Sequence, residues 1–558
     1  MKKIVHVCLL TALLTGLGTS AFANGAKDRG AEDLVLSEPG TYPLVEEKAT
    51  LSCFATLSGT MTSFEYEENS FTKVMEDLTN VHIEWKVATE ADAETKFNLI
   101  IASGDYPDMF MSPKKMETNL TKIQVLGDEG VLTPLESYIT EGTNMQEIYN
   151  RFPRLKNILT LPDGHIYSMP SLTGAYHAQA QAKMWIYEPW LKALGLDMPE
   201  TTAEFQAVLR AFKERDPNGN GLADEIPLVA SKNNSGWNSQ IDTFLMSSFI
   251  YNDSSSYGHR RMLLEDGKVV VSYDKPEWRE GLRYMKGLYD EGLMASESFT
   301  QTKDQLKQMV DGPSQPVVGT VPGGWQGSIS QISVDDNVRW KNFVTVPPLE
   351  GPTGYRSTPY FADMGLTDRI SDLLITTSCD YPELAFRWGD TLYDPDVSMR
   401  ACWGVEGVNF ELLDEDSGIM GVDGDPAKFR VLEQPKGNVG WNNRHPRYLY
   451  FADYHSKQAD NPDRPIESVL YAETHDKYLP YVPDADSILP LMAFSPEAAN
   501  EVAELETQLK SYVNEMVARF VIGDADLDAD WDDYLDELNN IGLERYVELY
   551  QAAVDANM

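Results

Sequence analysis

Reactive side chains are scarce in this chain of 558 residues, which has only four cysteines and eight histidines. The histidines do not recur at the close spacings from which zinc sites are built. The motifs of serine hydrolases, zinc proteases and phosphate-binding loops do not occur either. The sequence therefore gives no support to a metalloprotease, a serine hydrolase or a nucleotide-hydrolysing enzyme.

Basic residues are also few. The chain has 46 lysines and arginines against 87 aspartates and glutamates, a formal net charge of −41 at pH 7. A chain so acidic repels nucleic acids and anionic membrane surfaces. We therefore exclude nucleic acid as a partner. A polyanionic ligand is disfavoured unless a local basic pocket overrides the global charge.

Long apolar runs are missing except at residues 4–17, and that run is too short to span a bilayer. Two lysines precede it, and a small-x-small triplet follows at residues 21–23. This order is typical of a cleaved secretory signal, with a retained membrane anchor as the alternative. We predict a signal peptide at residues 1–23. Cys8 lies too early in the run to carry a lipid, so we expect a free periplasmic or otherwise extracytoplasmic protein.

Three cysteines would remain after cleavage, Cys53, Cys379 and Cys402. An odd number cannot pair fully within one chain. A disulfide between Cys379 and Cys402 and a set of buried free thiols are both compatible with the sequence.

The length predicts more than one domain, because a single core rarely grows beyond about 300 residues. Residues 49–55 and 81–87 have the apolar pattern of strands, and residues 71–78 between them are apolar at helical spacing. Strand, helix and strand in this order form a βαβ unit, which implies a parallel sheet. We expect an N-terminal α/β lobe over residues 24–180, completed by about residues 360–405.

A second α/β lobe is expected over residues 181–359 and about 406–558. Thr201 and Glu204 form a capping box before an amphipathic helix. Residues 317–325 have the composition of a strand, and helical periodicity returns near the C-terminus. The predicted fold class is therefore α/β.

Residues 216–227, D-P-N-G-N-G-L-A-D-E-I-P, predict a structural Ca²⁺ loop in this second lobe. They begin with the pattern D-x-[DN]-x-[DN]-G, but the twelfth position, where an EF-hand carries a bidentate glutamate, is Pro227. We therefore expect a calcium loop of another kind that closes early. The expected oxygen ligands come from Asp216, Asn218, Asn220, the Leu222 carbonyl, Asp224 and Glu225. A solvated asparagine–glycine turn is the alternative.

Several motifs together resemble the extracellular solute-binding proteins of ABC importers, in the family-one type that takes up sugars and oligosaccharides. Residues 104–108, G-D-Y-P-D, resemble the family's G-x-x-P-D before a strand. Residues 190–227 resemble the helix-then-calcium segment of the branch that contains alginate-oligosaccharide binders. Residues 347–354 and 404–407 resemble that branch's P-P-L-x-G-P-x-G and G-x-E-G motifs. The resemblance spans nearly the whole mature chain.

The resemblance implies a two-lobed periplasmic-binding-protein fold, with crossing hinge segments and a ligand cleft between the lobes that closes by hinge motion. It implies the substrate-binding component of an ABC importer, which is not an enzyme and which delivers its ligand to a membrane permease. We expect a monomer. Members of the family often carry a lipid anchor, and this chain lacks the cysteine that such an anchor needs.

A sugar-binding cleft needs aromatic platforms for the C–H faces of the rings and directed polar groups for the hydroxyls. Four of the candidates are tryptophans that stand beside glycines outside any regular periodicity. The others are a carboxylate in a glycine-flanked loop and residues at strand ends or crossings. The candidate ligand-binding residues are Trp237, Trp325, Trp403, Glu406, Trp441, Tyr176, Ser112 and Lys114. Plain packing or simple surface exposure is the alternative for each.

An exported glycoside hydrolase or lyase is the rival class. Such an enzyme needs two carboxylates around one bond, and 87 acidic residues leave such a pair open. A sensor that presents its ligand to a receptor would use the same fold and cleft. The global charge favours a neutral or cationic oligosaccharide over a uronate, and a peptide or another solute stays an alternative.

Overall fold

The computed structural model describes residues 34–57, 65–89, 92–112, 120–232, 237–253, 261–332, 339–361, 365–366, 369–433, 435, 437–442, 445–489 and 494–557. The predicted signal peptide therefore lies outside the described residues. Within the described ranges, no helix is both long enough and apolar enough to cross a membrane.

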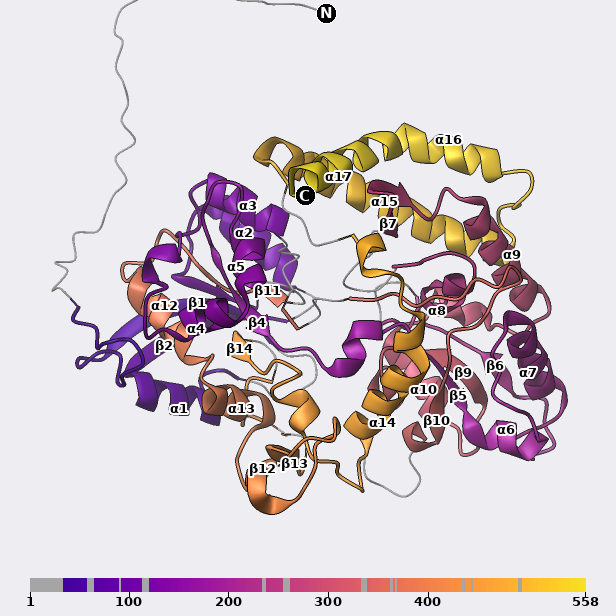
Figure 1. Cartoon of the computed structure of the whole chain (residues 1–558), viewed down its shortest axis with the longest axis horizontal. Helices are drawn as coiled ribbons and strands as arrows, with labels where there is room; N and C mark the ends of the chain where they lie inside the picture. Colours follow the sequence, from indigo (N-terminus) through magenta and orange to yellow (C-terminus); the bar gives the residue numbers. More distant parts are fainter. Residues whose placement is uncertain are drawn as a thin grey trace, which may run out of the picture.

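The first lobe is built on a six-stranded sheet with the order β14-β4-β11-β3-β1-β2 (Figure 1). Its strands are β1 (Ala49–Thr56), β2 (Val81–Ala88), β3 (Met109–Met111), β4 (Ser168–Leu172), β11 (Arg369–Ile375) and β14 (Arg447–Tyr448). The strands β2 and β3 both pair with β1 in parallel, as the βαβ pattern predicted. In contrast, β11 returns antiparallel between β3 and β4.

Helices cover this first sheet and follow from local sequence. The Asn69 side chain caps the first of them by accepting from the Phe71 N–H, and Asn80 ends it in the left-handed region at φ 58°. The helices are α1 (Ser70–Thr79), α2 (Ala93–Ser103), α3 (Leu120–Asp128), α4 (Asn144–Arg151), α5 (Pro153–Leu159), α12 (Pro382–Thr391) and α13 (Pro395–Trp403).

The second lobe is built on a four-stranded sheet with the order β10-β5-β9-β6. Its strands are β5 (Met184–Tyr187), β6 (Ile226–Leu228), β9 (Val318–Pro322) and β10 (Phe343–Val346). Its helices are α6 (Glu188–Leu194), α7 (Thr202–Glu214), α8 (Asp242–Leu245), α9 (Pro276–Asp290), α10 (Lys303–Asp311), α11 (Gln326–Ile329), α14 (Ile466–Glu473), α15 (Pro496–Ile522), α16 (Trp531–Ile541) and α17 (Leu543–Asn557). The capping box of Thr201 and Glu204 forms as predicted and starts α7.

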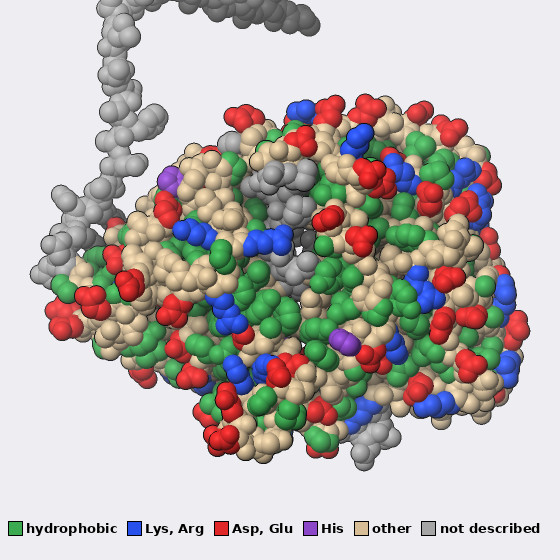
Figure 2. Space-filling model, viewed as in Figure 1, with side chains coloured by type: hydrophobic (Ala, Val, Ile, Leu, Met, Phe, Trp, Pro, Cys, Tyr) green, Lys and Arg blue, Asp and Glu red, His purple; other side chains and the backbone are tan. Residues whose placement is uncertain are grey.

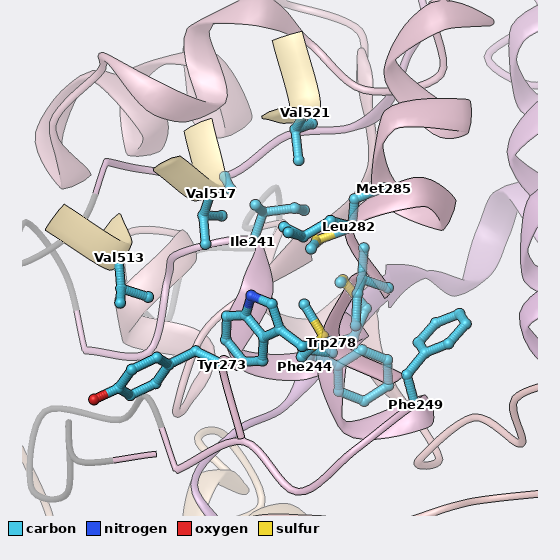
Figure 3. Close-up of a cluster of buried hydrophobic side chains, with 14 of the residues drawn as sticks. Ile241, Phe244, Phe249, Tyr273, Trp278, Leu282, Met285, Val513, Val517 and Val521 are labelled. Atoms are coloured by element: carbon cyan, nitrogen blue, oxygen red, sulfur yellow. The ribbon is translucent and has the colours of Figure 1, made fainter. Parts of the chain in front are cut away.

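The core of the second lobe joins its sheet-side helices to the C-terminal helices. Val517 and Val521 of α15 lie on the side of Leu282 and Met285 of α9, and Val513 lies above Tyr273 (Figure 3). The three valines lie four residues apart, which puts them on one face of α15. Because α15 packs on α9 in this way, the C-terminal helices belong to the second lobe.

The chain passes between the two lobes from β4 to β5, from β10 to β11 and from β14 to α14. Figure 1 shows the two lobes side by side with these connections between them. Two small hairpins complete the described part, β7 (Met262–Glu265) with β8 (Lys268–Val271) and β12 (Phe410–Leu412) with β13 (Phe429–Val431).

We keep the division of the chain into two lobes as a proposal, with one change. The sequence predicts that about residues 406–558 all belong to the second lobe. However, β14 pairs with β4 in the first sheet, and Trp441 packs in the first core. β14 is an edge strand of that sheet, so we assign β14 and Trp441 to the first lobe.

The three cysteines that the signal would leave behind are all free thiols in the structure. Cys53 and Cys379 are buried, and Cys402 is half-buried. The Cys379–Cys402 disulfide that the sequence left open is therefore not formed. Cys379 lies in the first core, whereas the Cys402 sulfur lies 3.7 Å from the Nε2 atom of His445.

Candidate functional site

The strand ends place loops from both lobes at their junction. In the first sheet β1, β3 and β4 end at one edge, because β4 and β3 both run antiparallel to β11. In the second sheet β6, β9 and β10 end at the edge where β5 begins. The connections from β4 to β5 and from β10 to β11 run between these two edges. Ligands in α/β proteins collect at such carboxyl edges.

A pocket lies at this junction, between the second lobe and the β12–β13 hairpin region. Its volume is about 70 Å³, room for roughly two water molecules. Both aromatic and charged side chains face it. The lining residues are Trp325, Trp403, Val431, His455, Gln458, Asn461, Arg464, Ile466 and Glu467.

Two of the predicted tryptophans meet in this pocket from different parts of the fold. Trp325 follows β9 in the second lobe. Its indole packs against Gly327, and only glycine permits this, because a Cβ at position 327 would come within 2.2 Å of the ring. Trp403 ends α13 and packs against Phe429, with ring centroids 4.8 Å apart. Each side of the junction therefore contributes one of these two tryptophans to the lining of the pocket.

Trp237 packs against His177, with ring centroids 5.8 Å apart, and His177 in turn lies 3.9 Å from the pocket residue Glu467. The Trp237 indole N–H donates to Oε1 of Gln181, which also accepts from Nδ2 of Asn238 at 2.9 Å. The indole packs against Gly324, where a Cβ would come within 2.6 Å of the ring. The Nε2 atom of Gln181 and the Oδ1 atom of Asn238 are buried and have no hydrogen-bond partner among the described residues. Buried polar atoms of this kind are suited to water or to ligand hydroxyls.

Glu467 is the carboxylate that the pocket contains. Its Oε2 atom lies 3.9 Å from Nδ1 of His177. Burial raises the pKa of Glu467 to about 7 and lowers the pKa of His177 well below its usual value. Burial likewise lowers the pKa of His455 to about 4. At neutral pH both histidines are therefore uncharged, and Glu467, which is only partly ionised, offsets part of the charge of Arg464.

Sequence reasoning did not find Glu467, Arg464 or His455. They stand in a loop-rich stretch without periodicity or a recognised motif. The connection from β14 to α14 brings them to the pocket, and that connection is set by the pairing of β14 with β4. A long-range pairing of this kind leaves no local signal in the sequence.

Trp441 is a core residue and not a cleft platform, which corrects the sequence interpretation. Its side chain is 0% exposed, and its ring centroid lies 4.7 Å from that of Phe71 and 5.6 Å from that of Trp85. Its indole N–H donates to Thr72 Oγ1 at 2.9 Å. Gly440 allows the close approach, because a Cβ there would lie 2.6 Å from the Ala401 carbonyl oxygen.

The remaining candidates do not line the pocket. Glu406 is exposed in a turn. Ser112 is buried at the end of β3, where its Oγ accepts from Nη2 of Arg369 at 3.2 Å. Lys114 lies outside the described residues. Tyr176 is half-buried in the connection from β4 to β5 and stacks on Tyr471, with ring centroids 4.2 Å apart.

The predicted calcium loop connects the end of α7 to β6. Both carboxylate oxygens of Asp216 accept backbone N–H groups, from Asn220 at 3.1 Å and from Gly221 at 2.9 Å. The side-chain amides of Asn218 and Asn220 donate to Asp224. Leu222, whose carbonyl was a candidate ligand, donates its N–H to Oδ1 of Asn220 at 2.7 Å.

Glu225 closes this loop with a carboxylate oxygen, Oε1, that is buried and has no hydrogen-bond partner among the described residues. Burial raises its pKa, and the charges of Asp216 and Asp224 add to the shift. These oxygens have the chemistry that Ca²⁺ prefers. In the described part of the chain, however, no three side chains of His, Cys, Asp or Glu gather as they would around a metal ion.

Comparison with known proteins identifies the family. The model of the bacterial extracellular solute-binding proteins matches residues 62–399. The fructooligosaccharide ABC transporter substrate-binding protein FusA of Streptococcus pneumoniae is 29% identical over 564 aligned residues, which cover 98% of this chain and 97% of FusA.

Solved structures agree with this match. FusA in complex with kestose has a TM-score of 0.75 at 26% identity, covering 91% of this chain and 99% of FusA. An EF-hand mutant of FusA with fructo-nystose has a TM-score of 0.74. The alginate-binding protein AlgQ2 without calcium ion has a TM-score of 0.68 at 19% identity, covering 93% and 100% of the two chains, which shows a shared fold. The predicted two-lobed fold is confirmed.

Proposed function

Because the chain belongs to the bacterial extracellular solute-binding proteins, we propose that it is the ligand-capturing component of an ABC importer for oligosaccharides. The family and the relatives named above are binding proteins rather than enzymes. The observation that carries the proposal is the pair Trp325 and Trp403, which face one pocket from the two sides of the lobe junction. A ligand between these rings would be held by both lobes.

The chemistry of the lining suits a neutral sugar. The indoles of Trp325 and Trp403 offer apolar faces to ring C–H groups, while Gln458, Asn461 and Glu467 offer hydrogen bonds to hydroxyls. Among the described residues of the lining, Arg464 is the only cation, and Glu467, which is partly ionised near neutral pH, offsets part of its charge. We therefore propose an uncharged oligosaccharide as ligand, and the names of the FusA complexes make fructans the first class to test.

The place of action follows from the same proposal. We propose that residues 1–23 are cleaved on export and that the mature monomer works outside the cytoplasm. A membrane permease would receive the ligand there. A sensor that presents its ligand to a receptor stays the alternative, since it would use the same pocket.

We propose further that the loop at residues 216–225 binds Ca²⁺ as a structural ion. Its expected ligands are Asp216, Asn218, Asn220, the Leu222 carbonyl, Asp224 and Glu225. The orphaned Glu225 oxygen and the name of the FusA EF-hand mutant support this. The ion would fasten the end of α7 to β6 and would take no part in ligand chemistry.

Calorimetric titration with fructans of increasing length, from sucrose to the pentasaccharide fructo-nystose, tests the proposal. An oligogalacturonate series is the charged comparison. We expect micromolar or tighter binding of neutral chains, with no new product on chromatography after prolonged incubation. Tight binding of galacturonates alone would overturn the neutral-ligand assignment. Turnover that stops in a Glu467→Gln variant would instead identify a glycoside hydrolase.

A further inference from the structure

A row of aromatic rings, half-buried except for the exposed His475, runs across the junction of the lobes, outside the pocket. Each ring contacts the next, with centroid distances of 5.0, 4.7, 6.1, 4.2 and 6.2 Å. In order, the rings are Phe152, Tyr450, Phe451, Tyr176, Tyr471 and His475. Figure 2 shows hydrophobic side chains gathered in the middle of the visible face, where the two lobes meet.

This row continues the lining of the pocket. Glu467 and Tyr471 lie four residues apart on α14, which puts them on the same face of that helix. On the opposing segment, Tyr176 directly precedes His177, whose ring nitrogen lies 3.9 Å from the Glu467 carboxylate. The stacked pair Tyr176–Tyr471 therefore stands one helical turn beyond the pocket.

Polar groups border the same pair. Burial raises the pKa of Tyr471, with the charge of Asp423 adding to the shift and that of Lys457 opposing it. Lys457 is 2.7 Å from Asp423 and also contacts Asp425. Lys457 directly precedes Gln458, which lines the pocket. Aromatic faces with hydrogen-bonding groups at their rim are what an amphipathic sugar ring requires.

The small volume of the pocket indicates a role for Tyr176 and Tyr471 in ligand binding. A volume of about 70 Å³ is far below the several hundred Å³ of ordinary ligand sites. It holds part of one sugar unit, so the rest of an oligosaccharide must lie outside it. We propose that Tyr176 and Tyr471 form an outer platform that holds the units of a longer oligosaccharide projecting from the pocket. This inference rests on the proposed function and adds a preference for chain length to it.

The alternative role of the pair is to brace the connection from β4 to β5 against α14. A brace would affect every ligand alike, because it acts through the position of the lobes. A platform affects only ligands long enough to reach it. Chain-length dependence therefore separates the two roles.

The test is calorimetry on Tyr471→Ala and the unmodified protein with the same fructan series. We expect the variant to lose roughly three- to tenfold in affinity for the pentasaccharide and to bind the shortest ligand as the unmodified protein does. Tyr471→Phe keeps the ring and should retain the affinity for the pentasaccharide. Tyr512→Ala is the matched control. Tyr512 is also half-buried and stacked on a tyrosine, Tyr534, but it lies on α15 and not on α14.

An equal loss for all chain lengths, or no loss at any length, would overturn the platform while leaving the pocket in place. Failure of every saccharide to bind the unmodified protein would overturn the proposed function, and the platform with it.

Discussion

The Nδ1 atom of His177, in the connection from β4 to β5, lies 3.9 Å from the Oε2 atom of Glu467, in the first turn of α14. Burial disfavours the charged form of both, so the contact is not a strong ion pair. A carboxyl with a pKa near neutrality beside an uncharged imidazole changes its hydrogen-bonding role with pH. When protonated it donates to a hydroxyl, and when ionised it only accepts.

Glu467 should make the stability of the protein fall as the pH rises. Its pKa is about 7 in the folded state against a usual value of 4.5, so the folded state holds a proton that the unfolded state releases. Its contribution is therefore favourable below about pH 4.5 and is lost as the pH rises to about 7 and beyond, by up to about 3 kcal/mol. Thermal unfolding at pH 5 and pH 8 measures this difference.

The Glu467→Gln variant should remove that pH dependence. Relative to the unmodified protein, it should gain stability at pH 8 and change little at pH 5. Glu504→Gln, an exposed position on α15, is the control and should behave like the unmodified protein. Equal destabilisation of Glu467→Gln at both pH values would show that the carboxylate is not strained by burial.

Variants of Trp325 and Trp441 should separate an effect on ligand affinity from an effect on the free energy of unfolding. Trp325→Ala removes a wall of the pocket and should weaken the binding of neutral oligosaccharides by at least about tenfold, with little change in thermal stability. Trp441→Phe loses a buried hydrogen bond to Thr72 and some packing area, and should lower the free energy of unfolding by about 1–3 kcal/mol while affinity stays unchanged. Calorimetry and chemical denaturation on both variants measure the two effects.

The converse result would reverse the assignments. If Trp441→Phe weakened binding as strongly as Trp325→Ala, the buried position of Trp441 would not decide its role. If Trp325→Ala left affinity unchanged, the pocket between Trp325 and Trp403 would not be the ligand site.

Local features of the fold were predictable from the sequence, because the physics that sets them is local. The alternation in residues 81–87 predicts β2, and the capping box at Thr201 and Glu204 predicts the start of α7. Both depend on neighbours within a few positions. The order of βαβ units gave the parallel pairing of β1 with β2 and β3.

The site was predicted only in part, since its residues are assembled by distant pairings. Glycine-flanked tryptophans were a useful signal, but the same signal led to Trp441, where Gly440 permits packing into a core. Glu467 reaches the pocket because β14 pairs with β4 and the chain then crosses to α14. The residues within a few positions of Glu467 do not predict that crossing.

Asp390 should be important for the stability of the first lobe. Its carboxylate accepts the N–H groups of Asn144 and Met145 at 2.9 and 2.8 Å, which caps the start of α4 from α12. Burial nevertheless raises its pKa to about 6, so burial outweighs the hydrogen bonds. Asp390→Ala leaves the buried N–H of Met145 and the half-buried N–H of Asn144 unpaired and should cost about 1–3 kcal/mol in chemical denaturation. Asp396→Ala, at an exposed position in α13, is the control, and an equal cost there would contradict this account.

Removal of calcium should lower the thermal stability of the protein, because an ion that binds only the folded state adds stability in proportion to the logarithm of its concentration over its dissociation constant. Carboxylates in the loop at residues 216–225 repel one another without a cation, and the raised pKa of Glu225 reflects that repulsion together with burial. A chelator should therefore lower the melting temperature by several degrees, and excess Ca²⁺ should restore it. Asp216→Ala should abolish the response, whereas Asp197→Ala, exposed after α6, should keep it.

Because the loop joins α7 to β6, away from the pocket residues, fructan affinity at a temperature well below the transition should be the same with and without chelator. A melting temperature that does not respond to chelator in the unmodified protein would identify residues 216–225 as a solvated turn.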